Sequence, residues 1–152
     1  MLADTLRLDQ VDPAEFHGVF YVGGYGALWD LTDDPASRAL LEWRGRHRRP
    51  VAMVDHAPAA LRHVLDAESG PLVSHRQVTG FSRSEEMAAG FIQALPLVVE
   101  QELRRLGARY SKGPDGAPHV VRDGFLVTGQ NTASAAPAAR LLLEVLQADD
   151  GG

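Results

Sequence analysis

Residues 50–61 read Pro50-Val51-Ala52-Met53-Val54-Asp55-His56-Ala57-Pro58-Ala59-Ala60-Leu61, and they indicate the fold more directly than any other part of the chain. The first five residues are apolar and too few for a helix, so they predict a strand buried in a parallel sheet. The polar pair Asp55 and His56 follows at once, and residues 59–65 predict a helix. We therefore expect Asp55 at the end of a buried strand, in the strand–turn–helix setting of a nucleophile elbow.

The flanking sequence continues this alternation of strands and helices. The apolar run 18–22 ends in two glycines and predicts a second buried strand, and residues 119–128 predict a hairpin with Asp-Gly in its turn. Further short strands are predicted at 72–73 and 77–79, and helices at 35–46, at 85–107 with an interruption at Pro96, and at 133–148. The pattern predicts one α/β domain over residues 1–152 with a mostly parallel sheet, an extended polar start and a disordered last few residues.

Composition narrows the class of protein. The 152 residues are 45% hydrophobic and 23% charged, which suits a single core. The formal net charge of -5 gives no indication of a nucleic acid or an anionic membrane as partner. The chain has no cysteine, which excludes disulfides and thiolate catalysis. No signal peptide and no apolar run of roughly 18–20 residues is visible, so we expect a cytoplasmic protein without a membrane segment.

Two local groups of residues are expected to be structural. The arginines of residues 44–49 lie where the helix over residues 35–46 should end, and they predict a solvated helix terminus whose cations complement the helix dipole. Trp29 and Trp43 have apolar neighbours and are expected in the core.

Asp55 is the strongest candidate for chemistry. A side chain at such an elbow stands near the backbone amides of the following helix, which favour negative charge on that side chain or on a bound ligand. Ligands of open α/β sheets bind at the carboxyl ends of the strands, where Asp55 is expected. The alternative is that Asp55 only caps the helix, since Asp is a preferred N-cap residue.

No other pattern indicates a cofactor. The loop Gly23-Gly24-Tyr25-Gly26 does not satisfy Gly-x-Gly-x-x-Gly and suits a tight turn better than a dinucleotide site. The remaining histidines lack metal-ligand spacing; they are His17, His63, His75 and His119. We therefore expect no metal and no cofactor, and a small molecule as substrate or ligand.

Five blocks of the sequence resemble one known family. Residues 54–61 are similar to its Val-Cys-His-Gly-Pro-Ala-Ala-Leu, and residues 23–26 to its Gly-Gly-His-Gly loop. Residues 29–31 resemble its Trp/Phe-Asp-Leu, residues 78–86 its Thr-Gly-Phe-Ser segment ending in Glu-Glu, and residues 128–134 its Thr-Gly-Gln-Asn-Pro-Ala-Ser. The family is ThiJ/PfpI, in the class I glutamine amidotransferase-like superfamily. The resemblance is nearest to the branch of glutathione-independent glyoxalases (glyoxalase III) and chaperone-like stress proteins.

The resemblance implies a fold and a set of site residues. The fold is a flavodoxin-like three-layer α/β sandwich, here without the family's opening strand, helix and strand. The family's triad of cysteine, histidine and acid falls on Asp55, His56 and Glu86, with Glu85 a near alternative for the acid. Its oxyanion and substrate-binding positions fall on the Gly24-Tyr25-Gly26 loop and on Ala57, which replaces a family glycine.

The exchange of cysteine for Asp55 leaves three functions open. A carboxylate is a poor nucleophile towards a carbonyl, and at about 4 Å it would repel a forming oxyanion by about 4 kcal/mol at a dielectric constant of 20, or roughly a thousandfold in rate. The first function is a hydrolase or lyase acting on a small carbonyl, with Asp55 as acid or base. The second is a hydrolase with Asp55 attacking a saturated carbon. The third is a silent binding or regulatory protein in which Asp55 mimics an oxidised cysteine.

The opening strand that the resemblance leaves without a counterpart also has a consequence for assembly. Residues 19–22 would lie at an exposed sheet edge, and no lysine, proline or inward charge between Gly18 and Gly24 would block pairing. We therefore expect a homo-oligomer such as a dimer, a partner chain on that edge, or residues 1–11 serving as a substitute strand.

Overall fold

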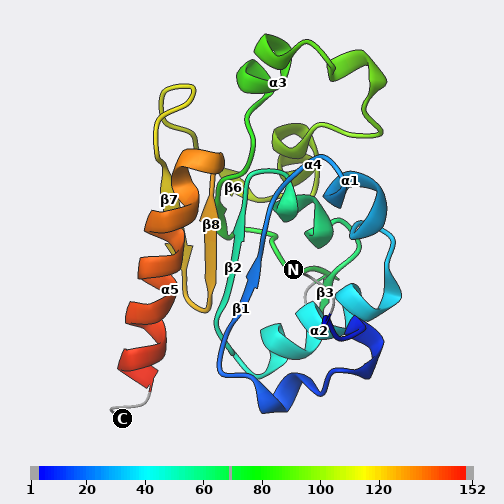
Figure 1. The fold of residues 1–152 in the computed structure, drawn as a ribbon, viewed down its shortest axis with the longest axis vertical. Coiled ribbons are helices and arrows are strands. Elements are labelled where there is room, and N and C mark those ends of the chain that lie inside the picture. Colours follow the sequence, from blue (N-terminus) through cyan, green and yellow to red (C-terminus); the bar gives the residue numbers. More distant parts are fainter. Residues whose placement is uncertain (1–3, 69, 150–152) are drawn as a thin grey trace.

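The computed structural model describes residues 4–68 and 70–149 and is built on one four-stranded sheet (Figure 1). Its strands lie in the order β1 (Val19–Tyr21), β2 (Val51–Val54), β8 (Leu126–Gly129) and β7 (Val120–Asp123). β1, β2 and β8 run parallel, whereas β7 pairs antiparallel with β8. The predicted mostly parallel sheet is therefore confirmed, and so is the hairpin over residues 119–128.

Helices cover both faces of this sheet, which confirms the predicted three layers. The side chains of β2 alternate between the two faces. Val51 and Met53 belong to a core with α2 (Pro35–Arg46), α4 (Val99–Arg105) and the 3-10 helix η3 (Ala57–Leu61). Ala52 and Val54 pack against α5 (Ala135–Asp149) on the other face. All four residues are buried. Figure 1 shows α5 on one side of the sheet, α1, α2 and α4 on the opposite side, and α3 beyond the ends of the strands.

The remaining elements are short. The α-helices are α1 (Ala27–Asp30), α2 (Pro35–Arg46), α3 (Arg83–Ala89), α4 (Val99–Arg105) and α5 (Ala135–Asp149). The 3-10 helices are η1 (Leu8–Gln10), η2 (Pro13–Glu15), η3 (Ala57–Leu61), η4 (Ile92–Ala94) and η5 (Thr132–Ser134). Two small sheets pair β3 (Leu65–Asp66) with β4 (Gly70–Pro71), and β5 (Gln77–Val78) with β6 (Arg109–Tyr110).

Four segments differ from their prediction. Residues 59–65 form a 3-10 turn and then a strand, and the pair 72–73 lies after β4 instead of forming a strand. The helix expected over 85–107 is broken into three pieces, because Gly90 takes a left-handed conformation (φ 84°) that ends α3 and Pro96 stands before α4. Residues 8–10, expected to be extended, form η1.

Two side chains also lie elsewhere than predicted. Arg44 is fully buried rather than solvated, because its guanidinium donates hydrogen bonds to the backbone carbonyls of His17 and Phe16. These bonds fasten the segment before β1 onto α2. Trp29, expected in the core, is 53% exposed.

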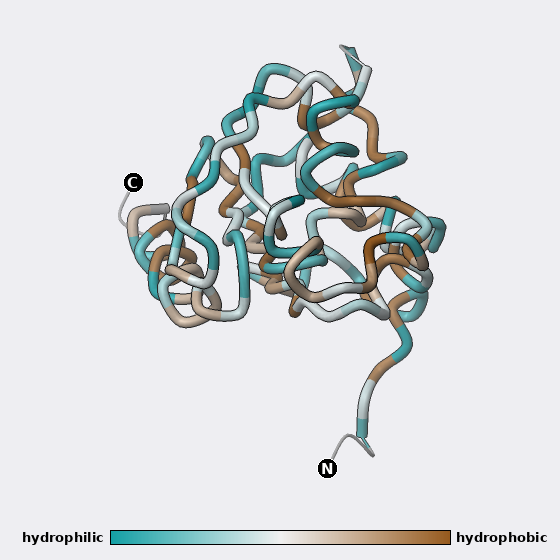
Figure 2. The backbone as a smooth tube through the Cα atoms, turned by 90° about the horizontal axis from the view of Figure 1, so that it is seen from above, coloured by the Kyte–Doolittle hydropathy of each residue, from teal (hydrophilic) through white to brown (hydrophobic). Residues whose placement is uncertain are grey.

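β1 lies at the edge of the sheet, as expected. Over the described residues no strand pairs with its outer side, and Val22, just beyond it, is 73% exposed. The predicted substitute strand is wrong for residues 4–11, which contain only η1 and are exposed or half-buried; residues 1–3 lie outside the described part. Figure 2 shows the described start of the chain leading away from the body of the molecule. No helix of the described part has the length and apolarity to cross a bilayer.

Candidate active site

The site is built where three parallel strands end side by side. Asp55 follows β2 directly and has a φ of 64°, in the left-handed region that costs a non-glycine residue about 1–3 kcal/mol. Its neighbours hold it there. The Asp55 N–H donates to the carbonyl of Gly129 at the end of β8 (3.0 Å), and the Asp55 carbonyl accepts from the N–H of Phe81 (2.9 Å). A strained residue pinned on both sides is the geometry of an elbow that presents a side chain outward.

The loop after β1 is shaped to receive this side chain. A Cβ on Gly23 would lie 2.4 Å from the Cβ of Asp55 and 2.6 Å from the carbonyl oxygen of Val54, so only glycine fits. Gly24 has a φ of 119°, which also favours glycine. Its N–H donates to Oδ2 of Asp55 at 3.0 Å. The glycine pair therefore brings a backbone donor onto the carboxylate.

His56 lies between two carboxylates. Its Nδ1 is 2.9 Å from Oδ2 of Asp55, and its Nε2 is 2.8 Å from Oε2 of Glu86. Only the doubly protonated imidazolium can donate to both. Burial lowers the pKa of His56, but the hydrogen bonds and charges of Asp55 and Glu86 outweigh it, so the pKa lies above its ordinary value. His56 and Glu86 are 2% and 0% exposed, so water does not compete for these bonds.

Two aromatic rings hold the imidazole from either side. The ring centroids of Tyr25 and Phe81 lie 4.3 and 4.4 Å from that of His56. The Tyr25 hydroxyl donates to Oε1 of Glu86 at 2.9 Å. Burial and this acceptor raise the pKa of Tyr25 to about 12, so the phenol remains a donor at neutral pH. Tyr25, His56 and Glu86 therefore form one hydrogen-bonded unit behind Asp55.

The structure brings most of the predicted residues together. One chain of hydrogen bonds joins Gly24, Asp55, His56, Glu86 and Tyr25 in that order. Asp55 does not cap the following turn, because the N-cap position of η3 belongs to the next residue and has no side-chain cap.

The other predicted residues lie apart from this contact network. Glu85 points to a different set of donors and does not contact His56. Gly26 is the N-cap residue of α1, and Ala57 is buried at the start of η3. The bond between the Tyr25 hydroxyl and Glu86 and the stacking of Phe81 were not predicted. Phe81 belongs to the Thr-Gly-Phe segment that pointed to the acid.

Two hollows flank the site. One of about 270 Å³ is lined by Tyr25, Trp29, Phe91, Ala94 and Leu95, all apolar or aromatic. The other, of about 380 Å³, lies along Phe81, α3 and the chain after β8. Each hollow thus shares one of the two rings that hold His56. In the described part of the chain, no three His, Asp or Glu side chains converge as metal ligands would.

Known proteins are similar to this chain in sequence and in fold. The chain is 33% identical over 141 residues to the human glutamine amidotransferase-like class 1 domain-containing protein 1, covering 93% of the chain and 64% of that protein. It is 32% identical over 155 residues to a probable glutathione-independent glyoxalase of Schizosaccharomyces pombe, covering 96% of the chain and 59% of the relative. The chain thus spans less than two thirds of the length of both relatives.

A solved structure gives the same result in three dimensions. The glyoxalase III of Candida albicans superposes with a TM-score of 0.83 at 26% identity, over 91% of this chain and 60% of that one. No protein-family profile matches the sequence. The relatives, the superposition and the ordered motifs around the elbow establish that this chain belongs to the ThiJ/PfpI family of class I glutamine amidotransferase-like proteins.

Proposed function

We propose that the chain acts on a small carbonyl or related electrophile by acid–base or hydrolytic chemistry, with Asp55 in the place of the family's cysteine. The observation that carries this proposal is that the two oxygens of the Asp55 carboxylate have different surroundings. Oδ2 accepts from both Gly24 and His56, whereas Oδ1 has no hydrogen-bond partner among the described residues. Asp55 is also the most exposed member of the triad, with a side chain 13% exposed against 3% for His56 and 1% for Glu86. A substrate would therefore meet Asp55 and not the imidazole.

The proposed chemistry follows from this arrangement. Oδ1 of Asp55 can take a proton from the substrate as a base and then return it as an acid, while the His56 imidazolium donates from Nδ1 to Oδ2. Glu86 and Tyr25 hold the ring in place during both steps. A carbonyl compound whose proton moves between neighbouring carbon and oxygen atoms needs such a paired acid and base, and the relatives named glyoxalases suggest 2-oxoaldehydes. The hollow beside Tyr25 would take an apolar substituent of the substrate.

A second candidate function is favoured by one specific contact. The Gly24 N–H, which would stabilise an oxyanion formed on a substrate, already binds the anionic oxygen of Asp55. Asp55 then resembles an oxidised cysteine held in the site, and the chain would bind a ligand or partner without turning it over. The two candidates differ in whether Asp55 is needed for turnover or only for binding.

The deciding experiment compares the wild type with Asp55→Asn and Asp55→Cys. Lactate formation from methylglyoxal and phenylglyoxal, and hydrolysis of activated esters and epoxides, would be measured with each protein. We expect methylglyoxal turnover to be poor, up to roughly a thousandfold below that of a thiolate enzyme. Any wild-type turnover in this panel should disappear in Asp55→Asn. Turnover that survives in Asp55→Asn would refute the enzymatic proposal. If the wild type is inactive throughout but its binding of a carbonyl ligand depends on Asp55, the silent reading is favoured.

We also propose that the free edge of β1 pairs with a second copy of the chain. Its support is the position of β1 at the end of the strand order and the exposure of Val22 beside it. A cytoplasmic location and the lack of a nucleic-acid partner stay predictions from composition.

A further inference from the structure

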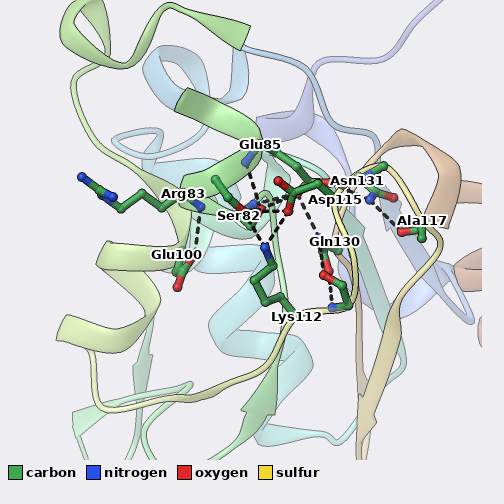
Figure 3. Close-up of polar contacts among 12 residues, drawn as sticks. Ser82, Arg83, Glu85, Glu100, Lys112, Asp115, Ala117, Gln130 and Asn131 are labelled. Atoms are coloured by element: carbon green, nitrogen blue, oxygen red, sulfur yellow. Dashed lines mark hydrogen bonds and ion pairs between the residues drawn. The ribbon is translucent and has the colours of Figure 1, made fainter. Parts of the chain in front are cut away.

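Glu85, the neighbour of the triad acid, is a buried carboxylate that the proposed chemistry does not use. It is 7% exposed. Its carboxylate accepts five hydrogen bonds, and Figure 3 shows the cluster around it. Oε2 accepts from the N–H and hydroxyl of Ser82 (3.1 and 2.7 Å) and from the side-chain amide of Gln130 (3.0 Å). Oε1 accepts from the N–H of Gly116 (2.9 Å) and the side-chain amide of Asn131 (2.8 Å). Both oxygens are thus fully engaged.

No cation contacts this carboxylate among the described residues. The nearby ammonium of Lys112 is bound to Asp115 and Ser84 instead (Figure 3). Burial raises the pKa of Glu85, but hydrogen bonds from Gly116, Asn131, Ser82 and Gln130 outweigh it and bring the pKa below its ordinary value. A charge held only by neutral dipoles depends on their direction, so the geometry of this cluster is tightly defined.

The donors come from three separate segments of the chain. Ser82 is the N-cap of α3 and forms a capping box with Glu85, Gly116 belongs to the loop between β6 and β7, and Gln130 and Asn131 follow β8. The loop is tied on further by the bond from the N–H of Gly113 to Gln130 (2.7 Å) and by that from Asn131 to the carbonyl of Ala117 (2.8 Å). Glu85 therefore joins the start of α3 to the end of the sheet.

The position of Glu86 depends on the same turn of α3. Glu86 has only His56 and Tyr25 as hydrogen-bond partners on its side chain among the described residues. α3 has seven residues, and so short a helix is marginal without tertiary contacts. Because successive residues of a helix point about 100° apart, fixing the side chain of Glu85 also fixes the direction in which Glu86 points.

We propose that Glu85 is a positioning residue: by fastening the first turn of α3 to the end of β8, it sets the carboxylate of Glu86 against His56. The catalytic meaning of this role rests on the function proposed above. The positioning itself can be tested without any turnover, so a failure of one is distinguishable from a failure of the other.

The test is an NMR titration of the His56 imidazole in the wild type, Glu85→Gln and Glu86→Gln. The groups that face this ring are the carboxylates of Asp55 and Glu86 and the phenol of Tyr25. In Glu85→Gln, the NH₂ group of the new side chain would face hydrogen-bond donors and could not accept from them. The attachment of α3 to the end of β8 should therefore weaken. The pH midpoint of the His56 titration should then fall, as it should in Glu86→Gln, but by a smaller amount.

A matched control separates positioning from general loss of stability. Glu102 is another buried glutamate, 8% exposed. It pairs with Arg105 of α4 and with Arg62, the C-cap residue of η3, and not with α3 or His56. Glu102→Gln should lower the melting temperature but leave the His56 midpoint unchanged. If Glu85→Gln behaves like this control, with a lower melting temperature and an unmoved His56 midpoint, the proposal is overturned. Should Glu85→Gln fail to fold, Asn131→Ala removes one donor only; a lowered midpoint there supports the proposal and an unchanged one overturns it.

Discussion

Replacing Glu86 with Gln tests the charge state of His56 most directly. The amide is close to isosteric with the carboxylate. Its oxygen can still accept from the Tyr25 hydroxyl, and its NH₂ can donate to Nε2 of a neutral imidazole that keeps its proton on Nδ1 for Asp55. The hydrogen-bond pattern is thus preserved while the buried charge is removed. The expected effect is a loss of the charge-assisted part of one bond.

The magnitude follows from the two kinds of hydrogen bond. A bond to a charged group contributes about 1.5–3 kcal/mol and a neutral one about 0.5–1.5 kcal/mol, so the variant should lose about 1–2 kcal/mol of unfolding free energy. This corresponds to about one pKa unit at about 1.4 kcal/mol each. For a chain of this size it lowers the melting temperature by about 2–4 °C per kcal/mol.

The pH dependence has a definite sign. The folded-state pKa of His56 is raised, so its charge stabilises the fold fully below the unfolded-state value of about 6.5 and ceases to do so as the pH rises through the folded-state pKa. The cost of Glu86→Gln, measured by urea unfolding from pH 5.5 upward, should therefore decrease above pH 6.5. Glu102→Gln is again the control, because Glu102 pairs with Arg105 and Arg62 and forms no hydrogen bond with α3 or with a histidine. A cost for Glu86→Gln that is constant with pH, or that grows on raising the pH, would show that His56 is neutral in the folded protein.

The remaining predictions concern local geometry and assembly. Gly23→Ala should lower the free energy of unfolding in urea, and any Asp55-dependent activity, by more than Gly24→Ala does. A Cβ on Gly23 would lie 2.6 Å from the backbone oxygen of Val54, whereas a Cβ on Gly24 meets nothing within 4 Å and costs only the strain of a φ of 119°. Equal effects of the two variants would contradict this explanation. Asp34→Ala should cost about 1 kcal/mol, because Asp34 caps α2 through the N–H groups of its first turn, and a melt unchanged within error would mean that the cap is dispensable. Light scattering after size-exclusion chromatography should show the wild type above 16.4 kDa, and Val22→Lys should shift it towards the monomer; a wild-type monomer at micromolar concentration would refute pairing at the β1 edge.

Local signals in the sequence were enough to predict β2, the strand before the elbow, and the helix α2. The apolar run before Asp55 could only be a buried strand, and the structure has β2 at Val51–Val54. The helix predicted over 35–46 is α2 with the same bounds, because Asp34 and Pro35 mark its start by their own chemistry. These outcomes depend on residues within one turn of each other, so no tertiary information was needed.

The partner of His56 could not be decided in the same way. Glu85 and Glu86 are adjacent and chemically identical, and only the docking of α3 decides which of them points at the imidazole. The Tyr25 hydroxyl binds Glu86 across 61 positions of the chain, a contact that no local pattern encodes.

The burial of Arg44 also could not be predicted from its neighbours in the sequence. Its place near the end of a helix predicted a solvated cation, but the carbonyls of Phe16 and His17 lie within reach once the segment before β1 crosses α2. The sequence by itself determined the strands of the main sheet, the helices α2 and α5, and the elbow that carries Asp55. Only the tertiary structure decided which side chains meet there, because a hydrogen bond depends on distances and directions between segments that share no sequence neighbourhood.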